Sequence, residues 1–191
     1  MKIVLATQNA HKIEEMTQIL GNTAEVLSLS AFPLDHELPE TGETLRENAL
    51  EKARYVAQKF GVNCLADDTG LEVDALNGAP GVYSARYAGE EKNPAKNMEK
   101  LLHELQGQTN RKARFKTVLA LILDGREYLF EGAVEGVILQ ERQGEKGFGY
   151  DPVFLPDGFS QSFAEMDPTQ KNEISHRGRA LQQLKLFLAQ R

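Results

Sequence analysis

The stretch Leu65-Ala66-Asp67-Asp68-Thr69-Gly70-Leu71 places two adjacent carboxylates between two apolar runs. The run at residues 62–66 predicts a buried strand, and residues 71–73 predict a second one. Adjacent side chains of an extended segment point to opposite faces, so Asp67 and Asp68 diverge unless the backbone turns there. Gly70 permits such a turn, and we expect one between the two strands.

Two interpretations of this pair of carboxylates remain open on spacing alone. An Asp in a turn often bonds its own backbone, which would make the pair structural. Carboxylates at the carboxyl end of a buried strand in an α/β protein also mark ligand sites. Other parts of the sequence are needed to distinguish a structural turn cap from a functional site.

Composition narrows the class of protein. The chain has 191 residues, a hydrophobic fraction of 41% and a formal net charge of -6, which suit one domain or two closely joined lobes. No polybasic block is present, so a nucleic-acid polymer is not expected as a partner. The lone Cys64 excludes an intrachain disulfide and fits a reducing compartment. The N-terminal apolar run is too short for a signal peptide or membrane span, so we expect a cytoplasmic protein without a membrane partner.

A junction between a strand and a helix lies near the N-terminus. Residues 2–7 predict a short buried strand, and the spacing of apolar residues predicts a helix from about Ala10 to Gly21. Free backbone N–H groups gather at such a junction and favour an anion. Lys12 lies in the first helical turn, where the helix dipole disfavours a cation, and a bound phosphate would reverse that penalty. The alternative is a solvated Lys12 with Asn9 as the N-cap.

A second helix is predicted from Leu45 to Phe60. Thr44 and Glu47 match a capping box, and Gly61 ends the helix. Glu40 and Glu43 precede it, where acidic residues suit the helix dipole but could equally bind a hard cation.

The rest of the chain predicts further elements. Asp124-Gly125 predicts a hairpin between residues 113–123 and 126–130, followed by a separate antiparallel strand at 134–139. Asn93-Pro94 predicts the start of a helix. A final helix is expected after Gly178.

Two motifs in the C-terminal half carry candidate ligand contacts. In Gly147-Phe148-Gly149-Tyr150-Asp151-Pro152, two glycines around a Phe allow close backbone approach and aromatic stacking, although a bulge would explain them equally well. Lys171 and Ser175-His176-Arg177 precede the final helix. His176 alone would more often be an ordinary cap or surface histidine.

Taken together, these stretches resemble the inosine triphosphate pyrophosphatase, or Ham1-like, family. The matching motifs run in family order from Thr7 to Arg177. They are Thr7-x-Asn9-x-x-Lys12, Glu40-Thr41-Gly42 with Glu47-Asn48-Ala49, Ala66-Asp67-Asp68-Thr69-Gly70-Leu71, residues 78–87 (GAPGVYSARY), Gly147 to Pro152 and Ser175-His176-Arg177. One departure is Thr69, where the family usually has Ser; the hydroxyl is kept.

The resemblance implies a single domain over residues 1–191. It would be an α/β fold with a long mixed twisted sheet flanked by helices, and two lobes with a substrate cleft between them. It implies a homodimer that hydrolyses ITP, dITP and XTP to the monophosphate and pyrophosphate with Mg²⁺. Asp68 would be the catalytic base, and Glu40 and Asp68 the metal ligands. The implied substrate contacts are Thr7, Gln8, Asn9, Ala10, His11, Lys12, Thr69, Phe148, Gly149, Tyr150, Asp151, Lys171, His176 and Arg177.

Chemical reasoning agrees with this assignment. Triphosphate cleavage needs charge neutralisation and a positioned water. Mg²⁺ prefers carboxylates together with phosphate oxygens. Two alternatives remain: a related Maf-type pyrophosphatase that acts on pyrimidine or modified nucleotides, and a nucleotide-binding protein without turnover on the same scaffold.

Overall fold

The computed structural model describes residues 1–191 and divides the chain into two compact units. Unit 1 comprises Met1–Asp68, Thr117–Gly132 and Arg177–Arg191, and unit 2 comprises Thr69–Lys116 and Ala133–His176. The strands form one mixed sheet in the order β2-β1-β3-β5-β6-β7, with β4 paired to β3. The strands β3 (Cys64–Val73), β5 (Lys112–Leu123) and β6 (Arg126–Ile138) each contribute residues to both units.

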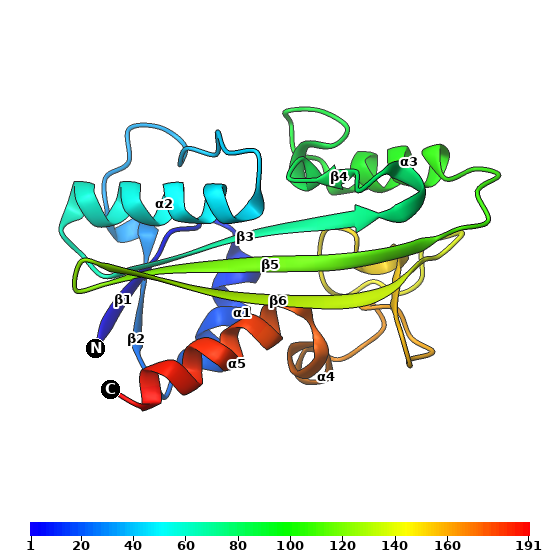
Figure 1. Ribbon diagram of the computed structural model, residues 1–191. Helices are drawn as coiled ribbons and strands as arrows, with labels where there is room; N and C mark the ends of the chain where they lie inside the picture. The colour runs from blue at the N-terminus through cyan, green and yellow to red at the C-terminus, as the bar shows by residue number, and fades with distance from the viewer. The chain divides into compact units, whose positions relative to one another are not determined.

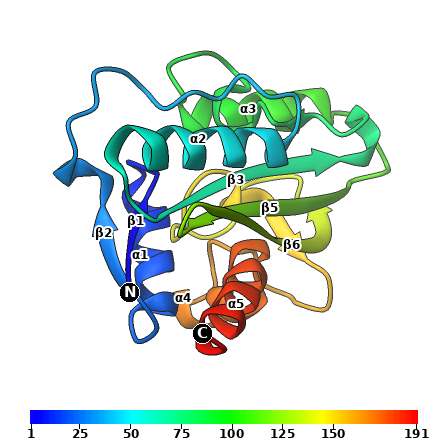
Figure 2. The ribbon, with the colours of Figure 1, turned by 60° about the vertical axis from the view of Figure 1, so that its left-hand side comes forward.

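The sheet of unit 1 has helices on both faces, and its first three strands are parallel. The strand β1 (Lys2–Leu5) pairs in parallel with β2 (Glu25–Ser28) and with the start of β3. The helix α2 (Leu45–Phe60) lies on one face of these strands, and α1 (Ala10–Leu20) and α5 (His176–Ala189) lie on the other (Figures 1 and 2). Leucines and isoleucines from β1, β3 and β5 pack against α1 and α5 in one apolar core.

The predicted helix signals of unit 1 are confirmed. Asn9 is the N-cap of α1, and its side chain accepts from the N–H groups of His11 and Lys12. Thr44 and Glu47 form the capping box of α2, and Gly61 ends that helix in the left-handed conformation with φ +64°.

The predicted hairpin turn is also present: Asp124 and Gly125 have φ of 50° and 76°, as a type I′ turn requires.

Unit 2 has a separate core of mostly aromatic and aliphatic side chains. The helix α3 (Pro94–Glu104), capped by Asn93 as predicted, contributes Met98 and Leu101. Phe115 packs edge-on against Phe154, with ring centres 4.7 Å apart. The short strands β4 (Pro80–Gly81) and β7 (Phe154–Pro156) pair antiparallel with β3 and β6, respectively. The helix α4 (Pro168–Ile174) begins at the N-cap Asp167, and short 3₁₀ turns lie at Leu29–Ala31, Asp74–Leu76, Ser84–Arg86 and Asp151–Val153.

Three predicted boundaries are wrong. The expected turn at Gly70 is absent, because β3 continues as one strand from Cys64 to Val73. The expected break near residues 131–133 is also absent, because β6 is one strand of 13 residues through Gly132. Pairing with neighbouring strands overrides the weak strand propensity of Gly, Asp and Glu in both places. The final helix starts at His176 and includes Gly178, rather than beginning after it.

Candidate functional site

Asp67 and Asp68 lie on opposite faces of β3, because the strand continues through them without a turn. Leu65, two residues before Asp67, packs in the core with α1 and α5, so Asp67 shares that face. Asp68 shares the other face, toward α2. Each carboxylate is therefore surrounded by side chains from different helices.

Asp67 binds two cations in the interior of unit 1. Its Oδ2 accepts from the Lys12 ammonium at 3.0 Å and from Nε and Nη2 of Arg177 at 3.4 and 3.3 Å. Arg177, which is 2% exposed, also donates through Nη1 to Glu15 of α1. The chain thus places Lys12, Asp67, Arg177 and Glu15 in one buried network.

The charges of this network decide the protonation of Asp67. Burial works against the carboxylate, but Lys12, Arg177 and Lys52 together outweigh it and lower the pKa of Asp67 well below its ordinary value. Burial lowers the pKa of Lys12, Asp67 opposes that effect, and the nearby Lys52 and Arg177 add to it. Asp67 is consequently ionised and committed to its cations at neutral pH.

Asp68 has a different set of partners, all from α2 and the loop before it. Lys52 Nζ donates to Asp68 Oδ1 at 2.9 Å and to Glu40 Oε1 at 2.6 Å, so one ammonium joins the two carboxylates. Asn48 Nδ2 donates to Asp68 Oδ2 at 3.3 Å. Burial raises the pKa of Asp68, although Lys52 acts in the opposite direction. Burial disfavours the charge on Lys52, but Asp68, Glu40 and Asp67 outweigh this and raise its pKa.

The strand-to-helix junction lies in the same unit. Thr7 Oγ1 accepts from the N–H of Asn9, and Asn9 caps the first turn of α1. Gln8, Ala10 and His11 are exposed, whereas the side chain of Lys12 is only 18% exposed. The cation in the first helical turn is thus compensated by Asp67 and is largely shielded from solvent.

A second group of predicted contacts lies in unit 2 around Asp151. The carboxylate Oδ2 of Asp151 accepts from the N–H of Phe148 at 2.8 Å and from Lys171 Nζ at 2.8 Å. The Lys171 ammonium lies 4.8 Å from the centre of the Phe148 ring. A Cβ on Gly147 would lie 2.2 Å from Asp151 Oδ2, so this turn requires glycine. Asp151 therefore organises both the aromatic ring and the lysine.

The other predicted residues of unit 2 are distributed around this turn and its core. Tyr150 donates its hydroxyl to the carbonyl of Ser84 at 2.8 Å, while Gly149 has φ +62°. His176 is 4% exposed and stacks on Phe115, with ring centres 4.6 Å apart. Thr69 is half-buried in β3.

The sequence analysis assigned no role to Lys52 or Glu15, and it named Asn48 only as part of a family motif. Lys52 and Asn48 had a detectable signal, because both fall on the buried stripe of α2 that also includes Ala49, Ala53 and Val56. A charged or amide side chain at a position spaced for the core needs a buried partner. Glu15 had no such signal, since its partner Arg177 is 162 residues away.

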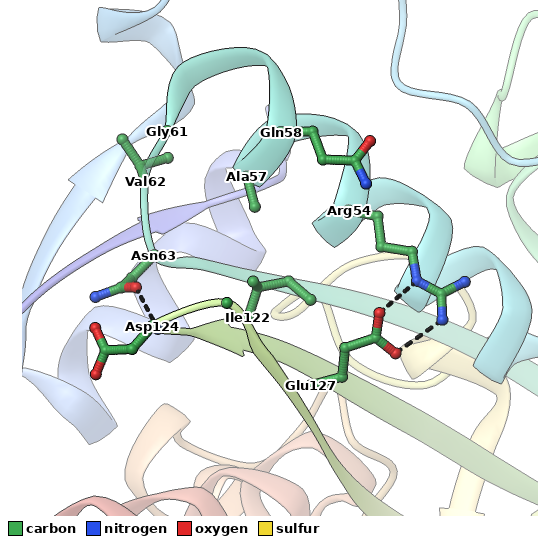
Figure 3. Close-up of a pocket in the computed structure, with 10 residues that line it drawn as sticks. Arg54, Ala57, Gln58, Gly61, Val62, Asn63, Ile122, Asp124 and Glu127 are labelled. Carbon is green, nitrogen blue, oxygen red and sulfur yellow. Dashed lines mark hydrogen bonds and ion pairs between the residues drawn. The ribbon is translucent and has the colours of Figure 1, made fainter.

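A cavity elsewhere in unit 1 contains none of the predicted site residues. It lies between the C-terminal half of α2 and the β5–β6 hairpin, and its lining includes Arg54, Asn63 and Glu127 (Figure 3). Glu127 accepts from Arg54 at 2.7 and 2.8 Å across it. No polar network like that around Asp67 and Asp68 faces this cavity, so we do not assign the chemistry to it.

Comparison with known proteins identifies relatives along the whole chain. The sequence model of the Ham1 family matches residues 3–187. The dITP/XTP pyrophosphatase of Christiangramia forsetii is 54% identical over 189 residues, covering 99% of this chain and 100% of that protein. The dITP/XTP pyrophosphatase of Porphyromonas gingivalis is 50% identical over 188 residues, covering 98% and 97%. The solved structure of the Staphylococcus aureus Ham1 protein superposes with a TM-score of 0.90 at 41% identity, covering 100% of this chain and 99% of that one.

Proposed function

Because the chain belongs to the Ham1 family, we propose that it hydrolyses the non-canonical purine nucleotides dITP, ITP and XTP to the monophosphate and pyrophosphate. The observation that carries the proposal is a group of charged side chains in unit 1. Asp67 and Asp68 are adjacent on β3, and each binds a lysine, Lys12 of α1 and Lys52 of α2 respectively. Such a cluster offers both the anionic and the cationic groups that triphosphate cleavage needs.

We assign the triphosphate to the cationic side of this cluster. The junction at Thr7, Gln8, Asn9, Ala10, His11 and Lys12 presents polar groups at the N-terminus of α1, where the helix dipole favours an anion. Lys12 would contact the distal phosphates, leaving the carboxylates near the α phosphorus. This arrangement favours cleavage between the α and β phosphates.

We assign a divalent cation, Mg²⁺, to Glu40 and Asp68. Both carboxylates already bind one cation, the Lys52 ammonium, through oxygens at 2.6 and 2.9 Å, so their chemistry fits a hard ion. No three acidic, His or Cys side chains are arranged to hold a metal ion by themselves, so phosphate oxygens and water would complete the coordination. When bound, Mg²⁺ would supply charge neutralisation to the phosphates.

Asp68 is the proposed proton acceptor for the attacking water. Burial raises its pKa, which brings a carboxylate closer to the range suited to a base, while Lys52 opposes that rise. Asp67 is less suited to this role, because its cations lower its pKa and occupy the carboxylate. We propose that Arg177 holds Asp67 and so supports Lys12.

We assign recognition of the purine to unit 2. Phe148 offers a ring for stacking, and Lys171 is a donor suited to the carbonyl at position 6 of hypoxanthine and xanthine. Adenine presents an amino donor there, so in a complex with ATP this amino group would face the Lys171 ammonium, which is also a donor. A site built for hydrogen bonding can reject such a mismatch by about 10⁴-fold or more.

A substrate panel tests this function. We expect kcat/KM for ITP, dITP and XTP to exceed that for ATP and GTP under one set of conditions, and phosphorus NMR to detect pyrophosphate as the first product. Orthophosphate as the first product would contradict the cleavage position. Preference for pyrimidine nucleotides would favour a Maf-type activity, and binding without turnover would favour a nucleotide-binding protein.

We also propose that the protein is a homodimer, as the family resemblance implies. Light scattering after size-exclusion chromatography should give about twice the chain mass of 21.3 kDa. A mass of one chain at working concentration would refute this.

A further inference from the structure

The loop that carries Glu40 is held against α2 by side chains that sequence reasoning did not single out. Residues 32–44 form neither helix nor strand. Thr41, directly after Glu40, donates its N–H to Glu51 Oε2 at 2.7 Å and its hydroxyl to Glu51 Oε1 at 2.8 Å. The next residue, Gly42, donates its N–H to Asn48 Oδ1 at 2.8 Å. The loop is thus fixed at two consecutive residues after Glu40.

The contact at Gly42 is close enough to define the path of the loop. A Cβ there would lie 2.5 Å from the Cβ of Glu47 and 3.0 Å from Asn48 Oδ1, so the backbone lies directly on the helix. Asn48 and Glu51 are three residues apart and Lys52 follows Asn48 by four, so all three project from one side of α2. The helix therefore holds the loop with two side chains and binds Glu40 itself with a third.

We propose that Glu51 is a positioning residue for Glu40. By accepting both donors of Thr41, it fixes the backbone beside Glu40 and keeps that carboxylate within reach of Lys52 and Asp68. Glu51 would act through Glu40 and not on the substrate itself, since its two oxygens accept from Thr41. This inference rests on the proposed function, in which Glu40 is a ligand of the divalent cation.

The test compares Glu51→Leu with Glu127→Leu. Glu127 is a matched control, since it also accepts two hydrogen bonds, at 2.7 and 2.8 Å, from a residue of unit 1 that is outside the proposed site. For Glu51→Leu we expect hydrogen exchange at the Thr41 amide to accelerate and Mn²⁺ affinity, followed by electron paramagnetic resonance with pyrophosphate present, to fall about tenfold, or about 1.4 kcal/mol. The Mg²⁺ concentration for half-maximal activity should rise by the same factor, with kcat at saturating Mg²⁺ little changed.

Two further variants separate positioning from general destabilisation. Glu51→Gln should recover most of the Mn²⁺ affinity, because the amide can accept from the Thr41 N–H and donate to its hydroxyl. Thr41→Val should weaken Mn²⁺ binding, and its effect should not add to that of Glu51→Leu, because Glu51→Leu already removes the hydroxyl contact that Thr41→Val removes. Equal Mn²⁺ affinities for Glu51→Leu and Glu127→Leu, or additive losses in the double variant, would overturn the proposal.

Glu40→Gln distinguishes failure of this inference from failure of the proposed function. If Glu40→Gln abolishes Mn²⁺ binding while Glu51→Leu has no effect, the positioning role is refuted and the metal assignment stands. If Glu40→Gln leaves Mn²⁺ binding unchanged, both are refuted.

Discussion

At the scale of single residues, the pKa values of two neighbouring aspartates shift in opposite directions. Asp67 faces Lys12 and Arg177, and its pKa is lowered, whereas burial raises the pKa of Asp68 beside Lys52. The difference follows from strand alternation, which directs Asp67 to the cations of α1 and α5 and Asp68 to Lys52 of α2. Pairs of titratable groups whose pKa values are driven apart often divide structural and catalytic roles between them.

The assignment of Asp68 as the base predicts the effect of Asp68→Asn. The amide keeps the shape but cannot accept the proton, so we expect kcat to fall roughly 10²–10⁴-fold. The melting temperature measured alongside would show whether the variant is folded. Activity of a folded variant within about threefold of the parent would refute the assignment, because general-base losses are far larger.

Replacing Asp67 should lower the stability of the folded protein, because this carboxylate holds two cations. Asp67→Asn leaves Lys12 and Arg177 buried without this carboxylate, and breaking a buried pair typically costs about 3–5 kcal/mol. Because the folded pKa of Asp67 is lowered from 3.8, its contribution is present above that value and is lost as pH falls below it. Denaturant unfolding should therefore show that the gap between parent and variant narrows in acid. A gap that is constant from neutral pH to below the ordinary carboxyl pKa would contradict this.

Replacing Lys52 should change how activity depends on pH. Its charge favours the ionised form of Asp68, so removing it in Lys52→Met leaves burial less opposed and the pKa of Asp68 rises further. Activity that needs ionised Asp68 falls as pH drops through that pKa. The acid limb of kcat/KM should accordingly move to higher pH in the variant. If the acid limb did not move, the titration that it reports could not be that of Asp68.

At the scale of elements, local signals predicted the ends of helices better than the continuity of strands. Asn9, Thr44 with Glu47, and Gly61 act through contacts within a few residues, so their effects could be read from the sequence. The unbroken course of β3 through Asp67, Asp68 and Gly70 depends on strands that are distant in sequence and on cations from two helices. Sequence spacing contains no information on those partners.

The same distinction explains what could be predicted of the candidate site. The carboxylates and Lys12 stood out because polar residues followed apolar runs. The network of Glu15 with Arg177, and the shared contact of Lys52 with Glu40 and Asp68, require the tertiary arrangement of α1, α2 and α5. The family resemblance gave candidate roles, and the fold supplied the partners that give those roles a physical basis.

Two glycines that flank α2 provide an element-scale prediction. Gly61→Ala meets no atom within 4 Å but forces a left-handed conformation on alanine, which costs about 1–2 kcal/mol and leaves the site untouched. Gly42→Ala introduces a contact of 2.5 Å with the Glu47 Cβ, so the loop after Glu40 must move. We expect similar losses of stability but a large drop in activity only for Gly42→Ala. Equal activities would show that the path of this loop does not matter for turnover.

At the scale of the whole molecule, two separate cores share three strands. One core packs β1, β3 and β5 against α1 and α5, and the other contains Phe115, Phe154 and Phe163 together with Met98 and Leu101 of α3. Because β3, β5 and β6 pass without a break from one unit into the other, we expect cooperative unfolding.

None of the helices combines the length and the apolar composition that a membrane span requires.

Cooperative unfolding makes global stability a measure of ligand binding. A ligand that binds only the native state at 100 times its Kd adds about 2.7 kcal/mol. For a chain of 191 residues this corresponds to a rise in melting temperature of about 5–10 °C. We expect this rise with an α,β-imido analogue of ITP, which resists the proposed cleavage, together with Mg²⁺. The corresponding ATP analogue should give a much smaller rise, because its amino group opposes the donor of Lys171.

Chelation is the matched control for this measurement. With EDTA the triphosphate would meet Glu40 and Asp68 with only the Lys52 ammonium between them and no divalent cation, and carboxylates repel phosphate at close range, so the stabilisation should largely disappear. An equal rise with EDTA would refute a role for the metal in binding. An equal rise with the ATP analogue would instead refute selection of the base at the binding step, and discrimination between purines would then have to arise in the chemical step, where the ratio of kcat values would reveal it.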